Sequence, residues 1–375
     1  MLNSAPRTPA IAPRLGQIMA PEHNSFGVLR LLMALLVLIS HSYLYAFGTD
    51  QAEPLTALTG HSLGEHAVQG FFILSGILVA QSFDRSRSLI DFAAARMLRI
   101  FPGLVVCVLL TALVLGPVVS LLPLAEYFTG AELPAYLIKT LSLSTGNAPL
   151  PGVFTGLPVA GSVNTSLWTL KYEVLCYAGL AAAGLAGLFK PRFRLIAAGL
   201  LAAYLAAVFS TEPKPAETYS FTDNARYFSL YFGTGMLAYL IRDQLVIRGG
   251  LLLPLFAIFA AALGTRFGEL ATALLLGYAI VWSASLSFGP LRGFCNRVDL
   301  SFGVYIYAGP IQQALLDVAP ALHPLIIAVL AAAVVLPLAL LSWIFIEHPA
   351  LRLRSRMRPA KVNAVPARRM ASVLA

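Results

Sequence analysis

Long apolar runs separated by short polar joints extend from residue 26 to residue 347 of this 375-residue chain. A helix needs about 20 apolar residues to cross a hydrocarbon core of roughly 30 Å. Ten runs approach that length: 26–47, 67–84, 98–122, 168–188, 194–210, 227–241, 250–265, 269–288, 301–319 and 324–346. The pattern predicts an all-α membrane protein, a polytopic bundle of about ten transmembrane helices. The sixth run is short, and Arg266 and Glu269 interrupt the junction of the seventh and eighth, so nine or eleven spans also fit.

The amino-acid composition also indicates that the lipid bilayer surrounds the chain and is one of its partners. With 58% hydrophobic and 11% charged residues, the chain has too little polar surface for a soluble globule of this size. The balance of 26 Lys and Arg against 17 Asp and Glu is basic, but these cations lie between apolar runs. This placement argues for membrane topology and against nucleic acid as a partner.

The positions of Lys and Arg predict which joints stay in the cytoplasm, because cytoplasmic joints carry the excess of both. If the N-terminus is cytoplasmic, the joints on the outer side contain only Lys139, Lys214, Arg226 and Arg266. Both ends are therefore predicted to be cytoplasmic. We expect a disordered cytoplasmic leader over 1–24, a membrane domain over 25–349 and a basic cytoplasmic tail over 350–375.

The longest predicted outer joint, 123–167, is rich in Gly, Pro, Ser and Thr. Such a loop can line an acceptor site or serve as a mobile connector. The cysteines Cys107, Cys176 and Cys295 show neither paired disulfide spacing nor a CxxC pattern, so they are interpreted as packing residues. No metal site is predicted.

Arg30 and His41 both lie in the first apolar run, where an ionisable side chain is costly. Eleven helical residues make about three turns, so the two side chains share a face and are separated by roughly 16 Å of rise. Imidazole can deprotonate a hydroxyl near neutral pH or accept an acyl group. A histidine hydrogen-bonded within the helix bundle is the structural alternative.

Arg96 and Arg99 lie one turn apart at the start of the third run. Residues three apart share a helix face, and two guanidinium groups on one face can clamp phosphates. Anchoring to lipid headgroups is the competing interpretation.

Glu173 places a carboxylate near the outer end of the fourth run. It could orient His41, bind an acceptor hydroxyl or pair with Lys171. Trp168 and Tyr172 nearby fit either an interfacial aromatic belt or a sugar-stacking platform.

Glu65, His66 and Gln69 open the second run on the same predicted side. His66 and Gln69 are candidates for acceptor contact, with an interfacial role as the alternative. Ser75 and Gly76 permit close helix contact. Glu347 and His348 precede Pro349, where we expect the last helix to end.

Several segments together resemble the acyltransferase family 3 membrane O-acyltransferases, which include enzymes that acetylate O-antigen, exopolysaccharide and nodulation factors. The matching positions are Arg30 and His41 with ten residues between them, Gly70–Gly76, Arg96 and Arg99, Ser166–Glu173, Phe232–Ala238 and Ile344–Pro349. Each is weak alone, and their joint occurrence in order is specific.

The resemblance implies a ten-helix bundle in a bacterial inner membrane, acyl-CoA bound near Arg96 and Arg99, and His41 as the essential group. Many relatives carry a histidine after the aromatic run of helix nine, where this chain reads Tyr305–Pro310. The hydrolase-like domain that some relatives append is not found in the sequence. Transfer is therefore expected to finish within the membrane domain or with a partner.

These features predict an O-acyltransferase that moves an acyl group, acetyl being the simplest guess, from cytoplasmic acyl-CoA to a hydroxyl of a carbohydrate or glycolipid. His41 acts as a base or as an acyl carrier, with Glu173 and Arg30 beside it. A transporter or flippase that uses His41, Glu173 and Arg30 as a relay is the main rival. A membrane assembly protein is a third possibility.

Overall fold

The computed structural model describes residues 12–145, 148–209 and 220–357, which are mostly helical. Each of the ten predicted runs contains a helix. These helices are α2 (Phe26–Phe47), α4 (Leu63–Asp84), α5 (Leu89–Leu110), α9 (Leu170–Leu185), α10 (Arg194–Phe209), α11 (Phe221–Leu240), α12 (Leu252–Ala262), α13 (Gly268–Ser285), α15 (Ser301–Val318) and α16 (Pro324–Ser342). Shorter helices are α1 (Leu15–Ile18), α3 (Pro54–Thr59), α6 (Gly116–Val119), α7 (Leu124–Thr129), α8 (Glu132–Leu141), α14 (Pro290–Cys295) and α17 (His348–Met357).

Five helical segments of the described chain are long and apolar enough to cross a membrane. They are α2, α4, α13 and the longer segments Leu89–Val119 and Pro324–Arg354. A π-helical turn at Thr111–Leu115 joins α5 to α6, and another at Trp343–Glu347 joins α16 to α17. Shorter apolar helices include α10 and α12. The chain is a polytopic, all-helical membrane protein, as predicted.

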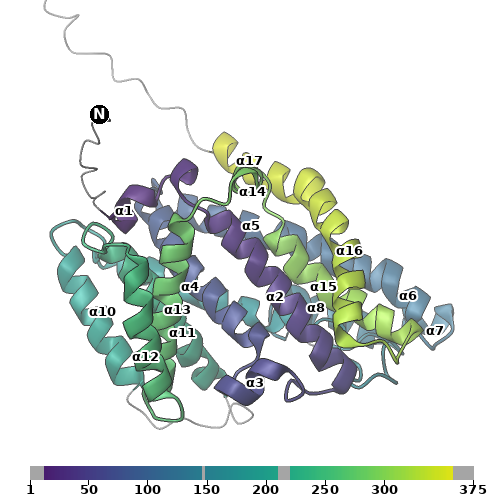
Figure 1. Ribbon diagram of the computed structural model, residues 1–375. Helices are drawn as coiled ribbons and strands as arrows, with labels where there is room; N and C mark the ends of the chain where they lie inside the picture. The colour runs from purple at the N-terminus through teal and green to yellow at the C-terminus, as the bar shows by residue number, and fades with distance from the viewer. Residues whose placement is uncertain (1–11, 146–147, 210–219, 358–375) are drawn as a thin grey trace, which may run out of the picture.

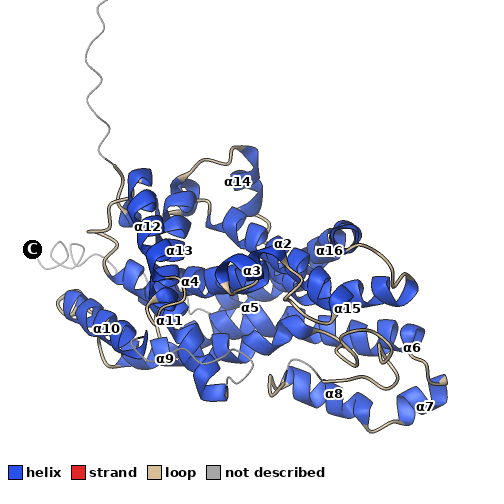
Figure 2. Ribbon diagram, turned by 60° about the horizontal axis from the view of Figure 1, so that its bottom comes forward, coloured by secondary structure: helices blue, strands red, loops and turns tan. Residues whose placement is uncertain are grey.

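Helix α2 lies at the centre of the bundle and contacts α4, α15 and α16 (Figure 1). Helices α10 and α12 lie at one side and α6 and α7 at the other, and the turned view agrees (Figure 2). Helices α14 and α17 lie at one end of the bundle and α3 at the opposite end (Figure 1). We name these the α17 end and the α3 end.

Helices α4 and α11 approach so closely that their backbones touch. A Cβ atom added to Gly76 would overlap the carbonyl oxygen of Phe232, and one added to Gly235 would overlap that of Ile73. Small residues allow membrane helices to come this close. The predicted contact role of Gly76 is confirmed, and this contact fixes the wall of α4 that faces the cavity described below.

The longest predicted joint is largely folded. Its first part forms α7 and α8, and residues 148–169, which we name the plug, pack into the bundle with many side chains buried. Gln313 of α15 donates to the carbonyl oxygen of Ser162 at 2.8 Å, and Asn164 donates to that of Ile306 at 2.7 Å. Non-helical backbone within a membrane protein needs such partners. The interpretation of this joint as a mobile connector is wrong for the plug.

Two predictions of local structure, the disorder of the leader and the end of the last helix, are corrected where the structure describes them. Leu15 is fully buried and its N–H donates to the carbonyl oxygen of Leu245, so the described part of the leader is ordered. The last helix does not end before Pro349 but continues to Met357. Pro349 is the second residue of α17, and the missing N–H is tolerated in a first turn after a π-helical turn.

Candidate active site

A cavity of about 420 Å³ lies among α2, α4, α5, α9, α15 and α17. Its polar lining residues are Arg30, Ser75, Arg96, Arg99, Thr169, Glu173, Tyr177, Asp299, Ser301, Tyr305 and Arg354. The volume falls within the range of roughly 300–1,000 Å³ that is usual for small-molecule sites. Four guanidinium groups favour an anionic ligand. The predicted residues Arg30, Arg96, Arg99 and Glu173 therefore meet at one cavity.

Two of the four arginines share one carboxylate. Arg30 and Arg99 both form ion pairs with Asp299, with 2.8 Å between Arg99 Nη2 and Asp299 Oδ2. Arg99 Nη1 also lies 3.4 Å from the buried Glu347 carboxylate. Burial alone would raise the pKa of Asp299, but Arg30 and Arg99 lower it to about 2. Asp299 therefore stays ionised at neutral pH between its two arginines, as a paired buried carboxylate can.

Sequence reasoning missed Asp299 and interpreted Glu347 as part of a helix end. Asp299 lies two residues before α15, where its Oδ1 accepts hydrogen bonds from the N–H and the hydroxyl of Ser301. In sequence such an aspartate is typical of an ordinary helix cap. The available signal was the demand of Arg30 and Arg99 for a counter-charge, because a cation in a membrane span needs one.

The other two arginines have different surroundings. Arg354 donates from Nε to Asp91 at 2.8 Å. Arg96 donates to the hydroxyl of Ser82 at 3.3 Å, and its guanidinium lies 5.7 Å from the ring centroid of Tyr177. Among the described residues, the buried Nε of Arg96 has no hydrogen-bond partner. Arg96 therefore has more spare donor capacity for an anion than Arg99, its predicted partner in a phosphate clamp.

Glu173 faces the cavity and not His41. It accepts hydrogen bonds from the hydroxyl of Tyr177 and, at 3.3 Å, from that of Ser75. Lys171, the other predicted partner, lies over the ring of Tyr172 instead, 5.0 Å from its centroid. The structure therefore gives Glu173 a place in the wall next to Arg96.

His41 lies about three helical turns beyond Arg30 on α2 and is not a lining residue of the cavity. Its Nδ1 atom is 3.3 Å from the hydroxyl of Ser166 in the plug, and the ring remains partly exposed. Tyr305, which does line the cavity, donates its hydroxyl to the carbonyl oxygen of Ser166 at 2.8 Å. One residue of the plug therefore links the cavity wall to the imidazole.

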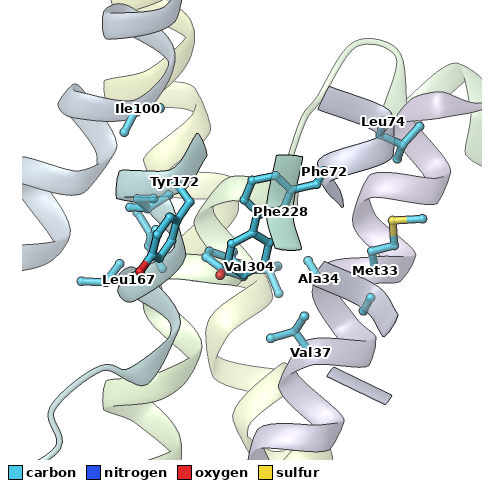
Figure 3. Packing of buried hydrophobic residues seen from close by; sticks show 14 of the residues in the cluster. Met33, Ala34, Val37, Phe72, Leu74, Ile100, Leu167, Tyr172, Phe228 and Val304 are labelled. Carbon is cyan, nitrogen blue, oxygen red and sulfur yellow. The ribbon is translucent and has the colours of Figure 1, made fainter. Parts of the chain in front are cut away.

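The predicted aromatic platform is part of a larger aromatic cluster. The ring centroids of Trp168 and Tyr172 lie 5.5 and 5.2 Å from that of Phe228, and Phe228 stacks on Phe72 at 4.3 Å. Figure 3 shows Tyr172, Phe228 and Phe72 in this cluster. Trp168 is 38% exposed, whereas Tyr172 is buried. Phe72 also lines the cavity. Of the two predicted sugar contacts, Trp168 is the accessible one.

His66 and Gln69 belong to a polar cluster at the start of α4. His66 Nδ1 lies 2.8 Å from Gln69 Oε1, and Gln69 donates to the hydroxyl of Tyr227 at 2.5 Å. His61 Nε2 lies 2.7 Å from Glu269 Oε1 in the same region. Gln69 is fully buried, so it holds the His66 ring from the protein interior. Sequence reasoning missed the partnership of His61 with Glu269, which joins residues 208 apart.

The His61 pair predicts a loss of stability at alkaline pH. Burial alone would lower the pKa of His61, but hydrogen bonds to Glu269 and Glu65 raise it to about 10 from 6.5. Because the folded state holds the His61 proton more tightly than the unfolded state, the protonated pair stabilises the fold fully below pH 6.5. This contribution to stability is lost as the pH rises towards 10. The midpoint temperature of thermal unfolding in detergent should therefore fall more steeply over this pH range in the wild type than in His61→Gln. Parallel curves for the two proteins would contradict the assignment.

Comparison with known proteins decides the family. A profile described as an acyltransferase domain, acyltransferase 3, matches residues 23–344. The chain belongs to acyltransferase family 3. An O-acetyl transferase of Shigella phage Sf6 is 33% identical over 336 residues, which cover 87% of this chain and 95% of the relative. Nodulation protein 10 of Rhizobium leguminosarum bv. viciae is 30% identical over 367 residues, covering 90% and 95%. No solved structure matches the chain.

The acyltransferase therefore is an enzyme, a multi-pass membrane O-acyltransferase homologous to an O-acetyl transferase. Its described residues contain no group of three or more His, Cys, Asp or Glu placed to hold a metal ion. Cys107, Cys176 and Cys295 are free thiols, and Cys107 and Cys295 are buried. Among the titratable residues predicted for the site, Arg30, Arg96, Arg99 and Glu173 line the cavity, and His41 lies beyond it.

Proposed function

We propose that the acyltransferase transfers an acetyl group from cytoplasmic acetyl-CoA to a hydroxyl of a carbohydrate or glycolipid at a bacterial inner membrane. The observation that carries this proposal is the cavity, where the Nε atom of Arg96 has no hydrogen-bond partner among the described residues and Tyr305 links the wall to Ser166 and His41. The phage relative is named an O-acetyl transferase, which supports the acetyl group.

The proposed topology has ten spans and both ends of the chain in the cytoplasm. It is supported by the sequence distribution of Lys and Arg and by the position of α1 and α17 on the same side of the bundle as α14 (Figure 1). The α17 end is then cytoplasmic and the α3 end faces outward. Arg96 and Arg354 accordingly lie towards the donor, and His66 and Trp168 towards the acceptor.

Arg96 is proposed to bind a phosphate of the donor, since its Nε atom has no partner in the described chain. Arg30 and Arg99, held by Asp299, contribute to the electrostatic potential of the cavity. The volume of the cavity suits the pantetheine arm better than the whole coenzyme. We place the nucleotide at the mouth near α17.

His41 is proposed to remove the proton of the acceptor hydroxyl. If Ser166 accepts the hydrogen bond from Nδ1–H, the Nε2 atom is left unprotonated and can act as the base. The acceptor oxygen attacks the thioester carbonyl carbon, the C–O bond forms, the C–S bond breaks, and the proton passes from His41 to the coenzyme sulfur. In the covalent variant, Nε2 attacks the thioester carbonyl carbon, the C–S bond breaks and the coenzyme leaves as the thiolate. The acceptor oxygen then attacks the acetyl carbon, the C–O bond forms, the C–N bond breaks, and the hydroxyl proton passes to the thiolate.

Glu173 is proposed to hold Tyr177 and Arg96 in place, which differs from an orienting role on His41. His66 and Trp168 are proposed to contact the carbohydrate, with Gln69 and Tyr172 supporting them from the buried side. Aromatic faces and polar hydrogen-bonding groups are suited to sugar rings.

Purified protein in detergent, given radiolabelled acetyl-CoA and lipid-linked glycans from a membrane extract, tests the function. A labelled acceptor that is released by mild alkali is the expected product, because alkali cleaves esters. Uptake of glycan into proteoliposomes without any acetyl-CoA dependence would favour the transporter alternative and refute the proposal.

Replacement of Arg96 with alanine should weaken donor binding. A hydrogen bond to a charged group is worth about 1.5–3 kcal/mol, so the KM for acetyl-CoA is expected to rise roughly 10- to 100-fold with a smaller change in kcat. Arg85→Ala is the matched control, because Arg85 is exposed at the end of α4. An unchanged KM in Arg96→Ala would remove Arg96 from the donor site.

A further inference from the structure

The hydroxyl of Tyr45 ties the plug to the helix that carries His41. Tyr45 lies one turn after His41 on α2 and is fully buried. Its hydroxyl lies 2.7 Å from that of Thr165, and the N–H of Thr165 donates to it at 3.3 Å. Residues four apart share a helix face. Two successive residues of the plug, Thr165 and Ser166, therefore contact two side chains on one face of α2.

A glycine on α15 leaves room for this contact. A Cβ atom added to Gly309 would lie 2.8 Å from the hydroxyl oxygen of Tyr45 and 2.9 Å from Asn164 Oδ1. The same Oδ1 atom accepts a hydrogen bond from the N–H of Ser166 at 3.2 Å. Helix α15 therefore packs directly against the Tyr45 hydroxyl and against the side chain that caps this part of the plug, and such close packing limits the movement of both.

The contact between Ser166 and His41 tolerates little displacement. Hydrogen bonds from N–H to oxygen usually span about 2.7–3.2 Å. The Ser166 hydroxyl already lies 3.3 Å from His41 Nδ1, so a further shift would break this bond and free the choice of protonated ring nitrogen. Tyr305 holds the Ser166 carbonyl oxygen, but from α15. Tyr45 holds the neighbouring residue from α2 itself, so it resists a shift of the plug relative to the imidazole.

We propose that Tyr45 is a positioning residue for acyl transfer, which keeps Ser166 within hydrogen-bond distance of His41. This inference rests on the proposed function and adds to it a residue that does not line the cavity. Tyr45 holds Thr165, and Thr165 fixes the place of the next residue in the chain. Ser166 then holds the Nδ1–H tautomer that leaves Nε2 free as the base. The loss of the Tyr45 hydroxyl should therefore impair the chemical step and leave donor binding at Arg96 unchanged.

The test is the kinetics of Tyr45→Phe, which removes one hydroxyl and keeps the ring beside His41. The kcat for acetyl transfer is expected to fall roughly 10- to 100-fold, as a misplacement of about 1 Å can cause. The KM for acetyl-CoA should stay within about twofold of the wild type. Tyr127→Phe is the matched control, because Tyr127 of α7 is equally buried and donates its hydroxyl to the carbonyl oxygen of Ala112 at 2.6 Å. Its kcat and KM should equal those of the wild type.

Combination with Ser166→Ala separates positioning from a general effect on the fold. Ser166→Ala removes the hydroxyl that Tyr45 is proposed to place, so it should lower kcat to a similar extent. Adding Tyr45→Phe to it should lower kcat no further, because the two changes interrupt one chain of contacts. Effects that multiply in the double variant would show that Tyr45 acts independently of Ser166 and would overturn the proposal. Thr165→Val removes the shorter contact from the side of the plug and replaces Tyr45→Phe in this test if that variant fails to fold.

A wild-type kcat in folded Tyr45→Phe or, in its place, folded Thr165→Val would overturn the positioning role and leave the proposed function intact. A wild-type kcat in Ser166→Ala would do the same, because Tyr45 would then have no hydroxyl to place. No labelled acceptor with the wild type would instead refute the proposed function itself, and the role of Tyr45 with it.

Discussion

Replacing His41 with alanine is expected to reduce acetyl transfer by about 10²–10⁴-fold, the usual contribution of a general base. The imidazole Nδ1 atom lies 3.3 Å from the hydroxyl of Ser166, and the carbonyl oxygen of Ser166 accepts a hydrogen bond from Tyr305 at the cavity wall. The variant should retain its level in the membrane, because the described contacts of the ring are one hydrogen bond and one edge contact with Tyr45. Initial rates with labelled acetyl-CoA measure the effect.

His23→Ala is the control for the loss of an imidazole, because His23 is exposed near the start of the described chain. Its transfer rate should match that of the wild type. Near-normal transfer by a well-folded His41→Ala protein would remove His41 from the chemistry. A rapid burst of acetylated protein in the wild type, missing in the variant, would favour the covalent route over direct attack.

Of the proposed substitutions, replacing Asp299 with alanine should cause the largest decrease in the free energy of unfolding. The change leaves the guanidinium groups of Arg30 and Arg99 adjacent and without their shared carboxylate. Removing one partner of a buried ion pair typically costs about 3–5 kcal/mol. We expect a clear fall in the thermal midpoint in detergent, and Asp317→Ala, at an exposed site near the end of α15, should leave it unchanged.

The pH dependence of stability gives a second measure of the Asp299 network. The pKa of Asp299 is lowered to about 2, against 3.8 for an ordinary aspartate. The ionised carboxylate therefore stabilises the fold fully above pH 3.8. This contribution disappears as the pH falls towards 2. The wild type should therefore lose stability over that interval more steeply than Asp299→Asn. An Asp299→Ala protein as stable as the wild type would show that the two arginines find other anions.

The helices were predictable because their signal is local. Each apolar run is a property of about 20 neighbouring residues, and α2 begins and ends at the predicted positions, Phe26 and Phe47. The helix α5 starts nine residues before its predicted run, at Leu89, because the charged Asp91 and Arg96 interrupt the apolar residues of its first turns and Asp91 is ion-paired with Arg354. Hydropathy detects the membrane-embedded part of a helix and not the part that extends beyond it.

The site was predictable only in part, because its contacts join distant residues. The shared face of Arg96 and Arg99 follows from helix geometry. The hydrogen bond from Arg99 to Asp299, in contrast, joins residues 200 positions apart in the sequence. The predicted link between Glu173 and His41 was based on charge and histidine chemistry. The structure instead provides Ser166 for His41, from a segment that hydropathy treats as a loop. Side-chain partners across helices require knowledge of which helices are neighbours.

The plug has a consequence for biogenesis. Its hydrogen-bond partners Ile306 and Gln313 lie 142 and 151 residues later than Asn164 and Ser162, on a helix that the ribosome makes after most of the others. Until α15 is inserted, the polar backbone of the plug has to remain in water, because lipid cannot satisfy it. The surroundings of His41 are therefore completed last, and a nascent chain that stops before Ser301 can occupy the membrane without becoming an enzyme.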